Sequence, residues 1–265
     1  MTERHRRRMP RVRLDRAMVE QGLADSRTTA QRLILAGEVR VDGEPAQRAS
    51  QVLAPGARLT VLARPPFVSR GGEKLAAALR EFGVAAGGKT CADVGASTGG
   101  FTDCLLQHGA ARVYAIDVGH GILHWKIRQD ERVVVLERTN ARHLDALPEP
   151  IDLVTVDVAF ISLRHILPSA RRWIVSGGDL VALVKPQFEA GRSAVGKGGV
   201  VGDPAVHRRV LEDVLGFCRD SGFGPLGLMR SPLRGPKGNV EFLLWAREGV
   251  PGSDLGAALE QVLAA

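Results

Sequence analysis

The stretch Thr90-Cys-Ala-Asp-Val-Gly-Ala-Ser-Thr-Gly-Gly-Phe-Thr102, followed by Val113-Tyr-Ala-Ile-Asp117, decides how most of this chain folds. An apolar run ends in an acid, breaks into a glycine-rich turn, reopens as a helix over 101–108, and returns as a second apolar run that ends in Asp117. This pattern is typical of a β-α-β unit, whose ligand site lies beyond the carboxyl ends of its strands. Glycines there let a ligand approach the backbone, and a terminal acid can accept hydrogen bonds from both hydroxyls of a ribose. The stretch therefore predicts a nucleotide-sized site.

Apolar runs of strand length recur along the chain. We predict strands at 90–94, 112–117, 133–136, 152–157, 180–185, 225–229 and 240–246, with helices between most of them. The last two runs leave no room for a helix, so they form an antiparallel hairpin. The predicted fold class is α/β: a Rossmann-like, seven-stranded, mostly parallel sheet that ends in this hairpin and carries helices on both faces.

The positive charge is concentrated near the N-terminus. Residues 1–64 carry a net charge of +6, whereas residues 65–265 carry +1, and ten of the thirteen basic residues of the first segment fall within the first forty. This distribution indicates a polyanion-binding appendage on a nearly neutral domain. The alternative is a solubilising face or a disordered arm.

Cysteine content and hydropathy indicate the compartment. Three cysteines without C-x-x-C spacing predict reduced thiols and neither a zinc site nor a disulfide framework. No apolar run approaches the length of a bilayer span, and the arginine-rich N-terminus lacks the apolar region of a secretory signal. We expect a soluble, cytoplasmic protein with no membrane partner and no bound metal.

The N-terminal quarter has its own pattern. Residues 1–10 predict a basic, disordered arm. A short helix starts at Leu14 and ends at Gly22, and a second is capped by Asp25 or Ser26 and ends at Gly37. A strand then runs from Val39 into an Asp42-Gly43 hairpin turn, and 59–62 is a closing strand.

These residues resemble the S4 RNA-binding domain, a small α+β module. The resemblance is carried by Arg13-Leu-Asp15, Gly22-Leu23, Ser26-Arg27, Ala30, Gly37 and Val39-x-Val-Asp-Gly43. It implies that arginines grip structured RNA mainly through phosphates, with little reading of base sequence. The implied RNA-binding residues are Arg11, Arg13, Arg16, Arg27, Arg32 and Arg40.

The domain plan follows from these patterns. We predict an arm at 1–10, the S4 domain at 11–63, a short stiff linker at 64–68 around Pro65-Pro66, a large domain at 69–250 and a C-terminal helix at 251–265.

Three nucleotide sites compete for the opening stretch. A dinucleotide fingerprint lacks its middle glycine, because Ala96-Ser97-Thr98 follows Gly95. Gly191 to Lys197 matches a P-loop, but Gly198 replaces the serine or threonine that holds magnesium, and the residues after it cannot open a helix. We predict that 189–203 is instead a mobile loop beside the active site.

The third possibility is a resemblance to the S-adenosylmethionine site of Rossmann-like methyltransferases. It implies that the amino-carboxylate end of the cofactor lies against the Gly95–Gly100 turn, that Asp117 holds the ribose hydroxyls, and that Asn140 lies near adenine. The implied cofactor-binding residues are Asp93, Gly95, Ala96, Ser97, Gly99, Gly100, Phe101, Thr102, Asp117, Val118, Asn140 and Ala141.

The methyl acceptor leaves separate traces. Amine methylation usually uses Asn/Asp-Pro-Pro-aromatic after the fourth strand, but this chain has Asp157-Val-Ala-Phe160. Methylation of pyrimidine C5 needs a thiolate, and all three cysteines fall in predicted strand or helix interiors. A ribose 2′-OH needs a base, and a lysine can serve if burial and a neighbouring cation lower its pKa. Four charged residues stand near predicted sheet edges: Lys74, Asp157, Lys185 and Glu241.

This set resembles the Lys-Asp-Lys-Glu tetrad of FtsJ/RrmJ-like ribose 2′-O-methyltransferases. The resemblance implies that Lys185 is the base, that Lys74 and Asp157 position the ribose and the methyl group, and that Glu241 orients Lys74 or Lys185.

An S4 module joined to such a domain resembles the TlyA/haemolysin A family over 11–247, through Val68-Ser-Arg-Gly-Gly-x-Lys-Leu75 and Lys185-Pro-Gln-Phe-Glu189. It implies methylation of cytidine 2′-OH groups in 16S or 23S ribosomal RNA or both, with ribosomal RNA or subunits as partners and no obligate protein partner. Pro65-Pro-Phe67 stands where relatives carry a tryptophan, which puts the coupling between RNA and cofactor binding in doubt. Two other hypotheses remain: a pore-forming cytolysin, and an RNA-binding assembly factor with an idle methyltransferase fold.

Overall fold

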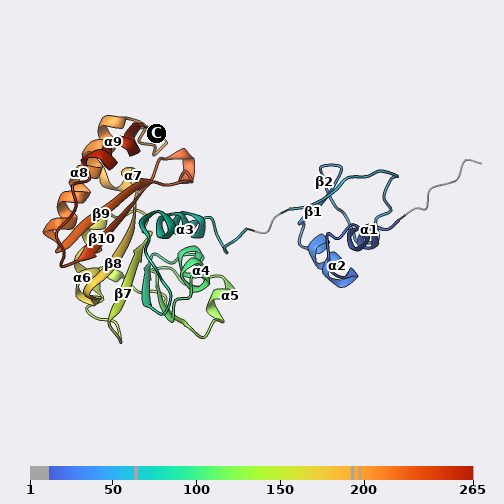
Figure 1. Ribbon diagram of the computed structural model, residues 1–265, viewed down its shortest axis with the longest axis horizontal. Helices are drawn as coiled ribbons and strands as arrows, with labels where there is room; N and C mark the ends of the chain where they lie inside the picture. The colour runs from blue at the N-terminus through green and yellow to red at the C-terminus, as the bar shows by residue number, and fades with distance from the viewer. Residues whose placement is uncertain (1–11, 63–64, 192–193, 197, 265) are drawn as a thin grey trace, which may run out of the picture. The chain divides into compact units, whose positions relative to one another are not determined.

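The computed structural model describes residues 12–62, 65–191, 194–196 and 198–264. The predicted arm at 1–10 and Arg11 lie outside these ranges. The chain divides into two compact units, with the boundary in the sequence between Pro65 and Pro66 (Figure 1).

The first unit packs two helices on a small antiparallel sheet. Helix α1 spans Leu14–Glu20 and α2 spans Arg27–Leu35, and the α2 cap is Ser26, whose hydroxyl accepts the Thr29 N–H at 3.2 Å. The sheet has the order β2-β1-β3, with β1 at Val39–Val41, β2 at Glu44–Pro45 and β3 at Leu59–Val61. Its core gathers the apolar helix faces and the inner strand residues: Leu14, Met18, Ala30, Ile34 and Val39.

The second unit contains the seven-stranded sheet that the sequence predicts, in the order β6-β5-β4-β7-β8-β10-β9. The strands are β4 (Thr90–Val94), β5 (Arg112–Ile116), β6 (Val133–Leu136), β7 (Ile151–Val156), β8 (Ile174–Val184), β9 (Phe223–Arg230) and β10 (Phe242–Glu248). Strand β10 runs antiparallel to both of its neighbours, β8 and β9, and the pairs among β4 to β8 are parallel. The fold class is therefore confirmed.

Strand β8 begins at Ile174, well before the predicted 180. Ser176-Gly177-Gly178 has the composition of a turn, yet the backbone stays in the sheet. Ile174 pairs with Ile151, and the register shifts before Asp179 pairs with Leu153. An irregularity in the ladder thus accommodates the two glycines, which local propensity alone does not predict.

Helices cover both faces of this sheet (Figure 1). Helices α3 (Gly71–Phe82), α4 (Gly100–Gln107) and α5 (Trp125–Arg128) lie on one face, and α6 (Leu167–Trp173), α8 (Pro204–Asp220) and α9 (Gly256–Ala264) lie on the other. Short α7 (Pro186–Glu189) follows β8. Leu153 belongs to the core under α3 and α4, whereas Val154 belongs to the opposite core, as the two-residue period of a strand requires.

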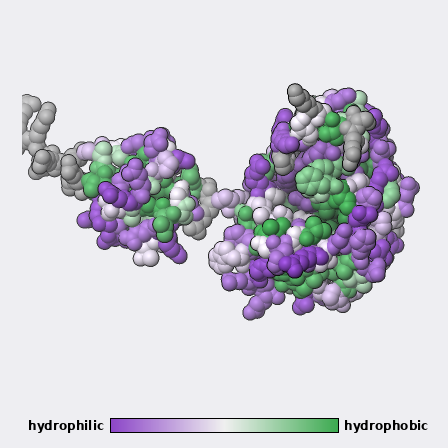
Figure 2. Space-filling model, turned by 180° about the vertical axis from the view of Figure 1, so that it is seen from behind, coloured by the Kyte–Doolittle hydropathy of each residue, from purple (hydrophilic) through white to green (hydrophobic). Residues whose placement is uncertain are grey.

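The surface mixes polar and apolar side chains (Figure 2). The most exposed large apolar residues are Leu35 and Phe160, both at 91%, followed by Val118 and Trp125. Within the described ranges, no helix is both long enough and apolar enough to cross a membrane.

Candidate active site

The predicted glycine-rich turn lies at the carboxyl edge of the sheet, and two of its glycines stand where neighbouring chain approaches closely. A Cβ atom on Gly95, which has φ +85°, would lie 2.5 Å from the Asp157 carbonyl oxygen. A Cβ on Gly100 would lie 2.1 Å from Ser69 Oγ. The turn therefore touches the loop after β7 on one side and the segment before α3 on the other.

A cavity of about 390 Å³ opens beside the end of β5. Asp117 lines it, and its two carboxylate oxygens accept the N–H groups of Ser97 at 2.8 Å and Gly119 at 2.7 Å. These bonds fix the carboxylate where a ribose could reach it. Asn140 also lines the cavity, and its side chain accepts the Arg142 N–H at 3.1 Å. Most other lining side chains are apolar, which suits a nucleoside: Val94, Ile116, Val118, Ile122, Ala141, Val158, Ala159, Phe160, Ile161 and Ile166.

A second cavity, of about 310 Å³, adjoins the first and shares Gly95, Ser97, Asp157 and Ala159 with it. All four predicted charged residues line this second cavity, with the turn residues Ala96, Thr98, Gly100 and Phe101. The structure thus brings together residues that lie far apart in the sequence.

The four charges form two ion pairs. Lys74 Nζ lies 2.5 Å from Glu241 Oε2, and Lys185 Nζ lies 2.5 Å from Asp157 Oδ1. Lys185 also donates to the Val158 carbonyl at 2.9 Å. Of the two partners that the sequence left open for Glu241, the structure selects Lys74.

One carboxylate oxygen here has spare accepting capacity. Asp157 Oδ1 is occupied by Lys185, but Glu241 Oε1 is buried and has no hydrogen-bond partner in the described part of the chain. A buried acceptor of this kind suits a ligand that brings its own donor, such as an ammonium or a hydroxyl.

Asp93 and Thr102 support the turn from inside the fold and line neither cavity. Asp93 is fully buried and accepts hydrogen bonds from Thr102 Oγ1 at 2.6 Å and Thr155 Oγ1 at 3.3 Å. Burial raises the pKa of the Asp93 carboxyl to about 7, against the opposing effect of the Thr102 hydrogen bond. Gly99 also packs inward, because a Cβ there would lie 2.9 Å from Leu123.

A third cavity, of about 760 Å³, lies beyond the loop after β7, and Phe160, Ile161, Phe188 and Arg142 are among its lining residues. The rings of Phe160 and Phe188 are 5.2 Å apart. Glu189 ties this loop to α7, accepting from Ser162 Oγ at 2.5 Å and the Leu163 N–H at 2.8 Å. The predicted mobility of 189–203 falls partly outside the described residues.

Sequence reasoning missed lining residues on both sides of the site. Ser69, Arg70 and Gly71 line the charged cavity just before Lys74, and 158–161 line the nucleoside cavity just after Asp157. These lining residues are close in sequence to Lys74 and Asp157, and this closeness is the sequence feature that could have identified them.

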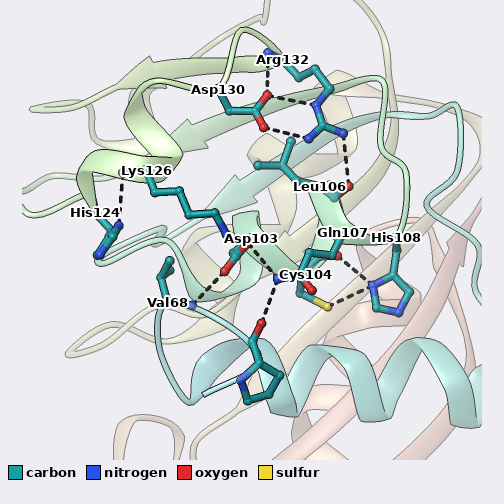
Figure 3. Close-up of polar contacts among 11 residues, drawn as sticks. Val68, Asp103, Cys104, Leu106, Gln107, His108, His124, Lys126, Asp130 and Arg132 are labelled. Carbon is teal, nitrogen blue, oxygen red and sulfur yellow. Dashed lines mark hydrogen bonds and ion pairs between the residues drawn. The ribbon is translucent and has the colours of Figure 1, made fainter. Parts of the chain in front are cut away.

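The segment 66–69, which we call the strap, is held against α4 (Figure 3). Buried Asp103 accepts the Val68 N–H at 2.8 Å and Gln107 Nε2 at 3.0 Å, and Gln107 also donates to the Pro66 carbonyl at 2.9 Å. Lys126 Nζ lies 3.7 Å from Asp103. Residues 66–68 were predicted as linker, but they pack within the second unit, because backbone polar groups of the strap find partners on α4.

The predicted RNA-binding arginines that the structure describes all lie in the first unit. Arg13 and Arg27 both bond to Asp15, Arg16 pairs with Glu20 at 2.8 Å, and Arg40 donates to the Gly43 carbonyl. Arg32 is exposed in the last turn of α2.

Comparison with known proteins agrees with this geometry. The family model described as FtsJ-like methyltransferase matches residues 67–248, and the S4 domain model matches residues 12–59. This chain belongs to the FtsJ-like methyltransferase family.

Full-length relatives share both parts. The 16S/23S rRNA (cytidine-2′-O)-methyltransferase TlyA of Mycobacterium tuberculosis is 48% identical over 241 residues, which cover 89% of this chain and 90% of that protein. Hemolysin A of Brachyspira hyodysenteriae is 41% identical and covers 88% of this chain and 98% of its own. A solved structure from Streptococcus thermophilus, described as a hemolysin, has a TM-score of 0.74 and 41% identity, over 97% of this chain and 95% of its own. The resemblance to the TlyA/haemolysin A family is confirmed.

Family membership makes the protein a methyltransferase whose cofactor is S-adenosylmethionine, and the S4 module indicates an RNA substrate. The cavity chemistry fits that cofactor, since an apolar nucleoside cavity with Asp117 continues into a charged one. Burial raises the pKa of the Cys91, Cys104 and Cys218 thiols to about 12, which does not suit a nucleophilic thiolate. Among the described residues, no group of three His, Cys, Asp or Glu side chains is placed to hold a metal ion.

We expect Asp103→Ala to weaken S-adenosylmethionine binding several-fold and to lower the free energy of unfolding by about 1–3 kcal/mol, because the part-buried Val68 N–H of the strap and the Gln107 amide lose their acceptor. Ligand titration and urea denaturation measure the two effects. Asp130→Ala is the control, since it removes an ion pair with Arg132 that lies in the same region but does not touch the strap (Figure 3). Equal behaviour of the two variants would refute a specific role for the strap contacts.

Asp93→Asn tests the buried carboxyl. Because its pKa is about 4 in the unfolded chain and about 7 in the folded one, protonated Asp93 stabilises the fold below pH 4, and this contribution is lost as pH rises to 7. Asparagine does not titrate. Between pH 4 and 7, we therefore expect the free energy of unfolding of the variant to rise relative to that of the wild type. The rise should reach a few kcal/mol, roughly 1.4 kcal/mol per pKa unit, with no further change above about pH 8. Urea denaturation at stepped pH measures the difference, and parallel pH profiles would contradict the assignment.

Proposed function

We propose that this protein transfers the methyl group of S-adenosylmethionine to the ribose 2′-OH of cytidine in ribosomal RNA, of the 16S or 23S type or both. The observation that carries the proposal is the pair of lysine–carboxylate contacts in the cavity beside the cofactor turn. The name of the Mycobacterium tuberculosis relative supports cytidine 2′-OH as the acceptor. A ribosomal substrate also supports a cytoplasmic location, with the S4 unit holding structured RNA.

The bound cofactor supplies an electrophilic methyl group on a sulfonium. Lys185 acts as the neutral amine: it accepts the 2′-OH proton at Nζ while the ribose oxygen bonds to the methyl carbon and the methyl–sulfur bond breaks. The Val158 carbonyl and Asp157 hold that nitrogen in place. Lys74, oriented by Glu241, positions the acceptor ribose in the same cavity. Asp117 receives the cofactor ribose, and the glycine turn lets the rest of the cofactor lie against the backbone.

An exposed aromatic ring supports an unpaired nucleobase as part of the substrate. Phe160 is 91% exposed and has φ +62°, a conformation that is rare for a bulky residue. Strain of this kind persists where the surrounding structure enforces it, frequently at functional sites. The ring adjoins both the nucleoside cavity and the large third cavity, so the base of the target nucleotide can stack there while its ribose faces Lys185.

The two rival functions have less support. An idle methyltransferase fold would not need four charged residues gathered in one cavity beside the cofactor turn. The word hemolysin in the names of relatives describes those proteins, and the described helices offer no membrane-crossing segment to a cytolysin.

Lys185→Ala should reduce methyl transfer by about 10²–10⁴-fold while leaving the Kd for S-adenosylmethionine within a few-fold, since a general base contributes that much. Transfer of labelled methyl groups to ribosomal RNA, followed by mass mapping of the 2′-O position, measures it. Lys185→Arg retains the positive charge but cannot act as a base, so it should be equally inactive. Methyl transfer by the arginine variant would show that Lys185 acts electrostatically and not as the base. If the wild type adds no methyl mass to either ribosomal RNA, the proposed substrate is wrong.

Phe160→Leu should lower kcat/KM for RNA by about 5- to 150-fold, the equivalent of losing one stacked base at roughly 1–3 kcal/mol. Phe160→Tyr retains the ring and serves as the matched control. Because Phe160 also borders the nucleoside cavity, the Kd for the cofactor is measured in parallel. A leucine variant with wild-type kinetics on RNA would exclude stacking at this position.

A further inference from the structure

Asp15 is a buried carboxylate in the first turn of α1, in the unit that lacks the cofactor site. Its side chain has 0% exposure, yet it is surrounded by donors. Arg13 donates to both oxygens at 3.0 Å, Arg27 donates to Oδ2 at 2.9 Å, and Gln31 donates to Oδ2 at 3.1 Å. The hydrogen bond from Arg13 is the largest cause that holds the pKa of Asp15 well below its usual range, so the carboxyl stays ionised at neutral pH.

The two arginines are neighbours because they share one oxygen. Nη2 of Arg13 and Nη2 of Arg27 both lie within 3.0 Å of Asp15 Oδ2. Both side chains nevertheless remain open to solvent, at 47% and 59% exposure. A guanidinium has five N–H donors, and Asp15 uses only two from Arg13 and one from Arg27. Within residues 12–62, the remaining donors of the two cations have no other hydrogen-bond acceptor, so they can serve an external anion.

The backbone that carries these arginines is also held. Arg13 forms a bridge with Val52, the Asp15 N–H donates to the Ala49 carbonyl at 3.1 Å, and Ser26 caps α2 immediately before Arg27. Each side chain therefore starts from a fixed Cα and ends at a fixed carboxylate.

We propose that Asp15 is a positioning residue that presets Arg13 and Arg27 as one binding site for a backbone phosphate of RNA. The proposal rests on the proposed RNA-binding role of residues 12–62. Two unpaired guanidinium groups at this separation would repel each other, and each would lose rotamer freedom on binding. The buried carboxylate offsets both costs before the RNA arrives.

A positioning role and net charge predict opposite changes in RNA affinity when Asp15 is neutralised. Removal of a negative charge from a basic surface should tighten the binding of a polyanion. If Asp15 acts by positioning, its removal should weaken binding although the net charge of the unit rises by one.

The experiment uses the full chain and purified bacterial ribosomal RNA in filter-binding titrations at several KCl concentrations. We expect Asp15→Asn to weaken binding about tenfold, as the ordering cost of two long side chains suggests. The magnitude of the slope of log K against log salt should fall by about 0.7–0.9, since roughly one phosphate contact is lost. Glu20→Gln is the matched control, because it also removes one negative charge beside an arginine of α1, but at the exposed Arg16 pair. It should leave binding unchanged or slightly tighter.

Arg27→Lys tests the same site without disturbing the buried carboxylate. Lysine keeps the charge but not the planar set of donors, so this variant should also bind several-fold more weakly. The effects of Asp15→Asn and Arg27→Lys should be less than additive in the double variant, because both act on one pair of guanidiniums. Thermal unfolding checks that Asp15→Asn is folded, and if it is not, Arg27→Lys decides.

Three outcomes are decisive. Equal or tighter binding by folded Asp15→Asn, or wild-type binding by Arg27→Lys, overturns the positioning role. Weaker binding with an unchanged slope of log K against log salt also overturns it. Such a result would mean that no phosphate contact was lost and that the substitution weakened binding through a general structural defect. Failure of the wild type to bind ribosomal RNA overturns the proposed function instead.

Discussion

The contact between the glycine turn and the end of β7 is the constraint on which the rest of the active site depends. Val94 pairs with Val156 in parallel, so the residues that follow the two strands leave the sheet side by side. A Cβ on Gly95 would lie 2.5 Å from the Asp157 carbonyl, and only a glycine allows this approach. The glycine-rich turn and the carboxylate that holds Lys185 are consequently parts of one rigid edge.

The strap adds a second support to the same turn. Ser69 packs on Gly100, and Asp103 and Gln107 of α4 hold the backbone of residues 66–68. Since α4 begins at Gly100, one helix carries both the end of the cofactor turn and the acceptors and donors for the strap. The strap then leads into α3, where Lys74 meets Glu241. A short piece of chain thus connects the glycine-rich turn to the charged cavity through hydrogen bonds and packing.

Carboxylates orient cations in both units, and burial decides how much each can do. Glu241 and Asp157 each hold one lysine in the charged cavity, and Asp15 holds two arginines in the S4 unit. Arg16 and Glu20 form a pair of similar length, but both side chains are at least half exposed, where water and salt screen the interaction. A buried acid fixes its partners because no water competes for them.

Sequence by itself determined the strand and helix pattern, the glycine-rich turn and the candidacy of the four charged residues, because these rest on local period, glycine placement and short motifs along the chain. It also identified the S4 module from short motifs, although the irregular start of β8 escaped local rules. Tertiary structure alone decided that Glu241 pairs with Lys74, across 167 residues of chain, that Asp103 holds the strap, and that Arg13 and Arg27 share Asp15. The physical reason is that periodicity reports which face of an element is buried, whereas ion pairs and cavities depend on which distant elements pack together.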